Sequence, residues 1–147
     1  MAQGIGIIGL GVMGERMLTN MTAHGGHRVA AAWDPASAAL ARLAKEHPAV
    51  RASASAEALV ADPEVACVYI ASPPASHLGH ARLAFARGKT VFCEKPLAID
   101  LAESEAMTEE VERLGLPAAI NFPFSSAPAA RLILETLPAA SSAASSA

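Results

Sequence analysis

The sequence predicts an α/β protein built on a doubly wound, mainly parallel sheet, and three observations support this. Short apolar runs of strand length alternate with stretches of helical periodicity, as in parallel strands joined by helices. The run at 66–71 is apolar throughout, as expected for a strand buried on both faces. Hydrophobic residues make up 52% of the chain and aromatic residues only 4%, which favours alanine-rich helices packed closely on a sheet.

The first half of the chain alternates in order between strands and helices. Its expected elements are a strand at 4–8, a helix from a glycine turn to Met21, a strand at 28–33, a helix at 37–46, a short strand near Val50 and a helix at 55–60. His24-Gly25-Gly26 ends the first helix and Pro48 closes the second, because glycine and proline interrupt helical periodicity.

The second half continues the alternation after Asp62-Pro63 turns the chain. Its expected elements are a strand at 66–71, a helix at 76–87, a strand at 90–93, a helix from Asp100 to Gly115 and a strand at 117–121. Ser76 is a candidate helix cap, and Asp100 with Glu103 resembles a capping box.

Composition limits the function classes. A chain of 147 residues can form one compact domain but hardly two. The net charge of −3 provides no basic surface, so we expect no nucleic-acid partner.

The N-terminus lacks a basic region and a cleavage site, and no apolar run is long enough to cross a bilayer. Cys67 and Cys93 lie in apolar strands and are expected to be reduced, so we predict a cytoplasmic protein without a membrane partner.

A G-x-G-x-x-G motif follows the first expected strand. The pattern also fits one frame upstream, but only this frame has a strand before it and an amphipathic helix after it. Gly9 makes the tight turn, Gly11 lets the backbone approach a pyrophosphate, and Gly14 lets helix and strand pack closely. The motif predicts a Rossmann-type dinucleotide site formed by Gly9, Gly11, Val12, Met13 and Gly14.

Asp34 lies twenty residues after Gly14, at the end of the second expected strand. A carboxylate there accepts hydrogen bonds from both ribose hydroxyls but repels a 2′-phosphate, and Pro35 and Ala36 supply no basic group. We therefore expect NAD rather than NADP. The alternative interpretation of Asp34 is the first residue of an Asp-Pro turn.

Two families of dehydrogenases fit the first third of the chain. The stretch from Gly9 to Met21 resembles the opening of the β-hydroxyacid dehydrogenases, which usually carry an Asn-Arg pair where this chain has Asp34-Pro35. The stretches VYIASPPASH (68–77), VFCEKPLA (91–98) and Ile120-Asn121 resemble, in the same order, motifs of the Gfo/Idh/MocA family. That family includes glucose–fructose oxidoreductase and inositol dehydrogenases, and the resemblance covers about residues 4 to 135.

The resemblance implies roles for several residues at the carboxyl edge of the sheet, where open α/β sheets bind ligands. Lys95 is the implied catalytic residue, hydrogen-bonding the substrate hydroxyl or the nicotinamide ribose and assisting proton movement. Other implied cofactor contacts are Ser72 and Pro73 on the adenosine and diphosphate side, His77 in the same loop, and Glu94 and Asn121 near the nicotinamide. The alternatives are a surface lysine at Lys95, a locally packed histidine at His77 and a carboxylate paired with a basic neighbour at Glu94.

We expect no metal. His77 and His80 are one helical turn apart, as metal ligands can be, but no third ligand is evident.

The resemblance also implies a division of the chain. We expect a dinucleotide-binding domain at 1–121, a linker and first helix at 122–138 (the helix at 128–137), and an alanine- and serine-only tail at 139–147 that is disordered or an artefact. Family members continue into an α+β substrate domain with an Asp-x-x-x-His pair. We expect that domain to be missing from this chain, the chain alone to be an inefficient catalyst, and an apolar face around Phe122, Phe124 and Leu132 to be exposed.

Three functions therefore remain open. The first is an NAD(P)-dependent oxidoreductase acting on a small-molecule sugar or polyol, represented by its cofactor-binding domain. The second is a non-catalytic dinucleotide-binding module, and the third is a β-hydroxyacid dehydrogenase fragment. The sequence leaves the oligomeric state open, with a homo-oligomer among the alternatives.

Overall fold

The computed structural model describes residues 4–123 together with Pro128, Ala130 and Leu132. Six strands form one sheet in the order β3-β2-β1-β4-β5-β6, and each neighbouring pair is parallel. The strands are β1 (Gly4–Ile8), β2 (Arg28–Trp33), β3 (Arg51–Ala52), β4 (Cys67–Ile70), β5 (Thr90–Glu94) and β6 (Ala118–Asn121). This order, which confirms the predicted doubly wound α/β fold, reverses direction between β1 and β4.

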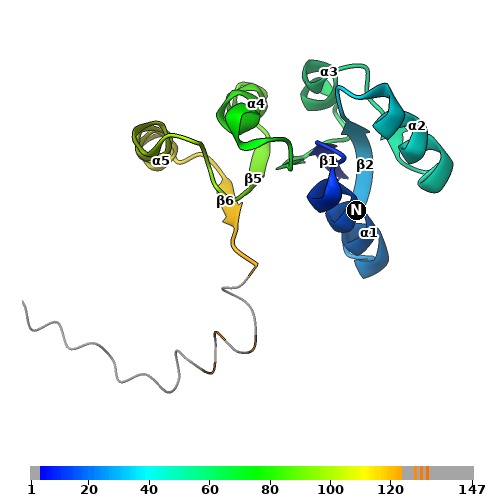
Figure 1. Cartoon of the computed structure of the whole chain (residues 1–147). Helices are drawn as coiled ribbons and strands as arrows, with labels where there is room; N and C mark the ends of the chain where they lie inside the picture. The colour runs from blue at the N-terminus through cyan, green and yellow to red at the C-terminus, as the bar shows by residue number, and fades with distance from the viewer. Residues whose placement is uncertain (1–3, 124–127, 129, 131, 133–147) are drawn as a thin grey trace, which may run out of the picture.

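Helices cover both faces of the sheet (Figure 1). They are α1 (Val12–His24), α2 (Ser37–Glu46), α3 (Ala56–Ala61), α4 (His77–Phe85) and α5 (Leu101–Leu114). On one face, Leu18 of α1 and Leu43 of α2 are buried with Ile7 of β1. On the other face, α3, α4 and α5 bury their apolar side chains against the sheet, among them Leu59 and Met107. The strands at the centre are therefore apolar on both sides, as the unbroken apolar run at 66–71 predicts.

The helix ends largely follow the predicted signals. The Asp100 carboxylate accepts a hydrogen bond from the Glu103 N–H at 3.0 Å and so caps α5. Gly25 and Gly115 end α1 and α5 in the left-handed conformation, with φ of 70° and 62°.

Helix α4 differs from its prediction. It ends at Phe85 rather than at 87, and a 3₁₀ turn (Pro74–Ser76) precedes it. Ser76 does not cap the helix, because its hydroxyl donates instead to the Pro73 carbonyl at 2.8 Å. Strand β5 also extends one residue further than expected, so Glu94 is its last residue.

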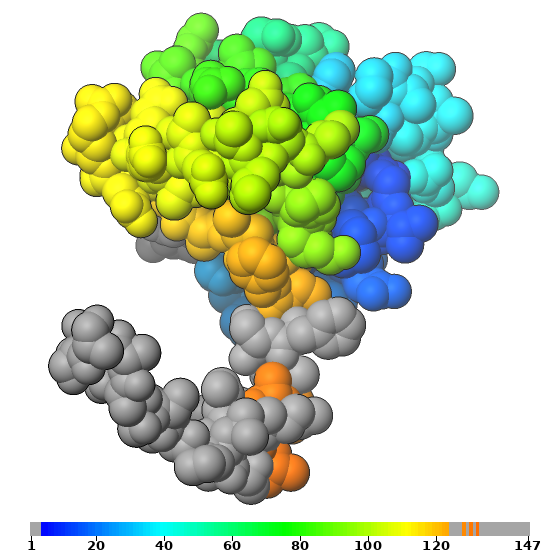
Figure 2. All heavy atoms as spheres, turned by 60° about the vertical axis from the view of Figure 1, so that its left-hand side comes forward, coloured from blue at the N-terminus to red at the C-terminus, as the bar shows by residue number. Residues whose placement is uncertain are grey.

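The C-terminal end of the described chain lies at the surface. In Figure 2 the residues of β6 (light orange) are exposed beside α5 (yellow). Phe122 and Leu132 are 57% and 61% exposed, as expected, whereas Phe124 and the tail at 139–147 lie outside the described residues. Of the helix expected at 128–137, the described residues Pro128, Ala130 and Leu132 are helical. No helix among the described residues has the length and apolar character needed to cross a membrane.

Candidate cofactor and catalytic site

The glycine turn, residues 9–11 after β1, packs tightly against the start of α1 and the end of β4. Gly9 has a φ of 95°, and a Cβ atom there would lie 2.5 Å from the Ser72 nitrogen. A Cβ atom at Gly14 would lie 1.9 Å from the Gly9 carbonyl oxygen. Both positions therefore require glycine. Gly11 is different, because a Cβ atom there would meet nothing within 4 Å.

The open space at Gly11 lies at the N-terminus of α1. Gly11 is the N-cap residue, and no side chain caps the first turn. The N–H groups of Val12, Met13 and Gly14 therefore lack a side-chain partner at the positive end of the helix dipole. Backbone donors beside open space are what a diphosphate requires, so this turn fits the predicted group.

Asp34 follows β2 and lies against the glycine turn. Its Oδ2 accepts a hydrogen bond from the Leu10 N–H at 2.8 Å, and its Oδ1 accepts one from the Ala36 N–H at 2.8 Å. A carboxylate has about four lone-pair positions, so both oxygens can still accept bonds from ribose hydroxyls. The turn-forming interpretation is thus correct for Oδ1, while Oδ2 ties the carboxylate to the glycine turn.

Arg42 of α2 supports the same turn from outside. Its Nη2 donates to the Leu10 carbonyl at 2.7 Å and to Glu15 Oε1 at 2.9 Å. Sequence reasoning missed both Arg42 and the Leu10 N–H, because residues separated by 24 to 32 positions come together only once the strand order is known.

The turn after β4 carries Ser72 and Pro73. The two serine hydroxyls, Ser72 Oγ and Ser76 Oγ, are 2.8 Å apart. Since the Ser76 hydrogen is given to the Pro73 carbonyl, Ser72 is the donor in this pair. Ala71 and Ser72 also form the wall against which Gly9 packs, so this turn adjoins the glycine turn.

His77 is a buried side chain at the start of α4, only 1% exposed. Its Nε2 lies 2.7 Å from the Ser72 carbonyl oxygen and its Nδ1 lies 2.9 Å from the Pro96 carbonyl oxygen. His77 therefore contacts the turn after β4 and the turn after β5 at the same time.

Glu94 is buried at the end of β5, where it is only 4% exposed. Its Oε1 accepts hydrogen bonds from the Tyr69 hydroxyl and from Asn121 Nδ2, the latter at 2.6 Å. Both partners are neutral, so the interpretation of Glu94 as a carboxylate paired with a basic neighbour is wrong. Tyr69 was missed by sequence reasoning because a tyrosine in an apolar strand resembles a core residue.

Burial changes the titration of the groups around Glu94. It raises the pKa of the Tyr69 hydroxyl, and the hydrogen bond to Glu94 adds to this. Burial, with a smaller contribution from the nearby Glu94 carboxylate, raises the pKa of Cys93 to about 12. A thiol with so high a pKa is a poor nucleophile, which agrees with the expected structural role of Cys93.

Lys95 lies beyond the end of β5 and is exposed. It forms no hydrogen bond or ion pair with another described residue, so its ammonium group is available to a ligand. The predicted site residues thus fall at the carboxyl ends of β1, β2, β4, β5 and β6. This is the edge at which open α/β sheets bind ligands.

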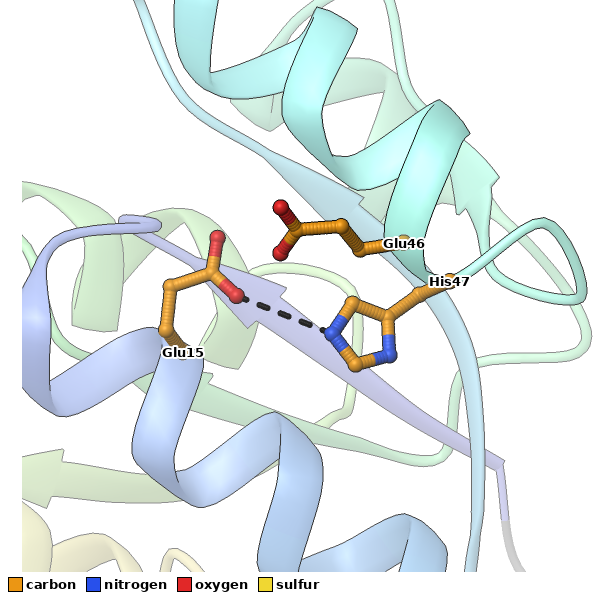
Figure 3. Close-up of side chains that lie close together, drawn as sticks. All are labelled: Glu15, Glu46 and His47. Carbon is orange, nitrogen blue, oxygen red and sulfur yellow. Dashed lines mark ion pairs between the residues drawn. The ribbon is translucent and has the colours of Figure 1, made fainter.

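A second group of polar side chains lies between α1 and α2 (Figure 3). Glu15, Glu46 and His47 bring ligand atoms within 4.8 Å of one another, which is compatible with a metal ion. However, Glu15 Oε1 is already bonded by Arg42, and Glu15 Oε2 lies 3.8 Å from His47 Nε2. A carboxylate committed to a guanidinium is a poor metal ligand, so we assign the group to the contact between these helices.

Comparison with known proteins identifies the class. Residues 3–122 match the family model described as an oxidoreductase family with an NAD-binding Rossmann fold. The chain belongs to this family, Gfo/Idh/MocA, which decides against the β-hydroxyacid dehydrogenase alternative.

The proteins similar to this chain include inositol dehydrogenases. The chain is 39% identical over 113 residues to inositol 2-dehydrogenase 2 of Saccharopolyspora erythraea, covering 76% of this chain and 32% of the relative. It is 26% identical to a scyllo-inositol dehydrogenase of Lactobacillus casei with bound NAD(H) and scyllo-inositol, with a TM-score of 0.83, covering 92% of this chain and 40% of that one. A biliverdin reductase from Synechocystis, solved with biliverdin and NADP⁺, is 25% identical with a TM-score of 0.80, covering 91% of this chain and 42% of that one. The chain spans about a third of the length of the curated relatives it matches.

Proposed function

We propose that this chain is the cofactor-binding part of an NAD-dependent oxidoreductase that transfers a hydride between nicotinamide and a hydroxyl carbon of a sugar or polyol. The observation that carries the proposal is the Asp34 carboxylate, fixed by the Leu10 N–H beside the open space at Gly11. A carboxylate at this position favours the free ribose hydroxyls of NAD and repels the 2′-phosphate of NADP. The relatives include both NAD and NADP proteins, so this local chemistry supports the preference.

The remaining predicted residues complete the cofactor site in this proposal. The backbone donors of Val12, Met13 and Gly14 hold the diphosphate at the start of α1. The other contacts are Ser72 and Pro73 along the diphosphate side and Asn121 on the nicotinamide side. His77 and Glu94 are buried behind them, where His77 bonds the Ser72 carbonyl and Glu94 bonds Asn121.

Lys95 is the proposed catalytic residue. The bound nicotinamide supplies the hydride acceptor. The exposed Lys95 ammonium donates a hydrogen bond to the substrate hydroxyl oxygen and stabilises negative charge there while the hydroxyl proton passes to solvent water and the hydride passes to the nicotinamide. The inositol dehydrogenases among the relatives support a cyclic polyol or sugar as the substrate class.

Cofactor titration and turnover test the proposal. NADH and NADPH binding to the chain would be followed by nicotinamide fluorescence, and NADH formation from NAD⁺ by absorbance with a panel of inositols and aldoses. We expect tighter binding of NADH than of NADPH and slow, polyol-dependent NADH formation. Equal affinity for both cofactors would overturn the preference. Failure to bind either cofactor would overturn the proposed function, and NADH formation that does not depend on a polyol would overturn the proposed substrate class.

A further inference from the structure

The His77 ring occupies an unusual position between two carbonyl oxygens. Nε2 faces the Ser72 carbonyl at 2.7 Å, and Nδ1 faces the Pro96 carbonyl at 2.9 Å. The side chain is 1% exposed, so these contacts do not compete with bulk water. His77 makes no ion pair with another described residue, and its polar contacts are these two carbonyl groups.

Carbonyl oxygens only accept hydrogen bonds. A ring nitrogen therefore needs a hydrogen atom to make either contact favourable, and a neutral imidazole carries hydrogen on only one nitrogen. A neutral ring would place a lone pair against a carbonyl oxygen at one of the two sites, without water to relieve it. Both contacts are satisfied together only when both nitrogens carry hydrogen.

The two carbonyl groups belong to turns that serve different parts of the proposed site. Ser72 is in the turn after β4, next to the glycine turn, whereas Pro96 directly follows Lys95 in the turn after β5. The strands β4 and β5 are neighbours, so the ring spans the gap between the two turns at the carboxyl edge of the sheet.

We propose that His77 is a positioning residue: its ring, with hydrogen on both nitrogens, bonds both turns and fixes the Ser72 turn relative to the Lys95 turn. A dinucleotide that contacts both turns then meets a preorganised site, whereas a ligand confined to the adenosine and diphosphate side gains little from the connection. This inference rests on the proposed function, because it assumes a dinucleotide that spans the two turns.

The first test reads the hydrogens of the ring directly. NMR of the chain labelled with ¹⁵N-histidine would resolve its five histidines, with the His77→Gln variant assigning the signals of His77. We expect two protonated ring nitrogens for His77. A single protonated nitrogen would overturn the double-donor arrangement. If His77→Gln does not fold, two-dimensional correlations to the neighbouring backbone would assign His77 in the parent chain instead.

The second test separates positioning from simple folding. The affinities of the parent chain and of His77→Gln would be measured calorimetrically for NAD⁺ and for ADP, with His80→Gln as the matched control one turn along α4. Losing one of the two bonds should weaken NAD⁺ binding about tenfold, while ADP binding changes less than about twofold. His80→Gln should leave both affinities near those of the parent.

The outcomes distinguish the inference from the proposal on which it rests. Unchanged NAD⁺ affinity in His77→Gln, or an equal loss for NAD⁺ and ADP, would overturn the positioning role. A parent chain that binds neither ligand would overturn the proposed function itself.

Discussion

At the scale of single residues, substitutions at Asp34 and Pro35 should reverse the proposed preference for NAD over NADP. In the variant Asp34→Ser with Pro35→Arg, the carboxylate that repels a 2′-phosphate is replaced by a hydroxyl and a guanidinium that can bind it. We expect the ratio of NADPH to NADH affinity to rise by about tenfold or more, corresponding to roughly 1.4 kcal/mol. Fluorescence titration measures both affinities. Pro35→Arg alone is the control, and a full reversal in that variant would mean that Asp34 does not select the cofactor.

The lysines at the two ends of β5 offer a matched pair of substitutions. Lys95 is exposed and unbonded among the described residues, whereas Lys89 donates to the carbonyls of Asp62 and Val65 at 3.0 and 2.7 Å, before the strand begins. Lys95→Met should lower polyol-dependent turnover by about 10²-fold or more without lowering the melting temperature. Lys89→Met should lower the melting temperature and spare turnover. A Lys95→Met variant with parental turnover would contradict the catalytic role.

At the scale of elements, the glycine turn and α1 place different demands on Gly11 and Gly14. A Cβ atom at Gly14 would clash with the Gly9 carbonyl at 1.9 Å, so Gly14→Ala must push α1 away from β1. We expect it to lower the free energy of unfolding by about 2–4 kcal/mol in urea denaturation. Gly11→Ala meets nothing within 4 Å and should fold normally, yet lose ADP affinity because the methyl group occupies the space for a diphosphate. Parental ADP affinity in Gly11→Ala would place the ligand elsewhere.

Local sequence signals predict the boundaries of some helices and strands better than others. The strand at 4–8 and the helix at 37–46 agree with the structure, because apolar periodicity and chain-breaking residues act within a few positions. The start of α4 was predicted less well. The Ser76 hydroxyl bonds Pro73 and Ser72 rather than the helix, and that choice depends on how the turn folds back on itself.

The polar cluster of Tyr69, Glu94 and Asn121 is harder to predict from the sequence than the helix and strand boundaries. Glu94 is 25 residues from Tyr69 and 27 from Asn121. The register of three strands brings these side chains to one place: Glu94 pairs with Asn121, and Tyr69 pairs with Phe92 two residues earlier. A motif around Glu94 indicates that the residue matters, but its partners follow only from the register.

At the scale of the whole molecule, the alternation of strands and helices predicts a parallel sheet but does not give the strand order. The order β3-β2-β1-β4-β5-β6 places β1 beside β4, and this pair creates the edge where the glycine turn meets Ser72. The cofactor-side residues could therefore be named from the sequence, whereas their arrangement along one edge depends on the crossover from β3 to β4.

The free energy of unfolding should fall at alkaline pH because of two buried side chains with raised pKa values, Cys93 and Tyr69. The folded chain holds the Cys93 proton up to a pKa of about 12 because the thiol is buried, and burial also raises the pKa of Tyr69. In the unfolded chain these groups release their protons near their ordinary values, about 8.5 for cysteine and 10 for tyrosine. Between those values and the folded ones the unfolded state binds fewer protons, so the free energy of unfolding falls as pH rises.

Replacing Cys93 isolates its share of this dependence. Each such group contributes a slope of up to about 1.4 kcal/mol per pH unit, so Cys93→Ala should make the decline between about pH 9 and 11 shallower by roughly 1 kcal/mol per unit. Urea denaturation at stepped pH gives the slope. Val91→Ala, on the same strand, is the control that lowers stability at every pH without changing the slope. An identical slope in Cys93→Ala and the parent would show that the thiol gives up its proton as readily in the folded chain as in the unfolded one.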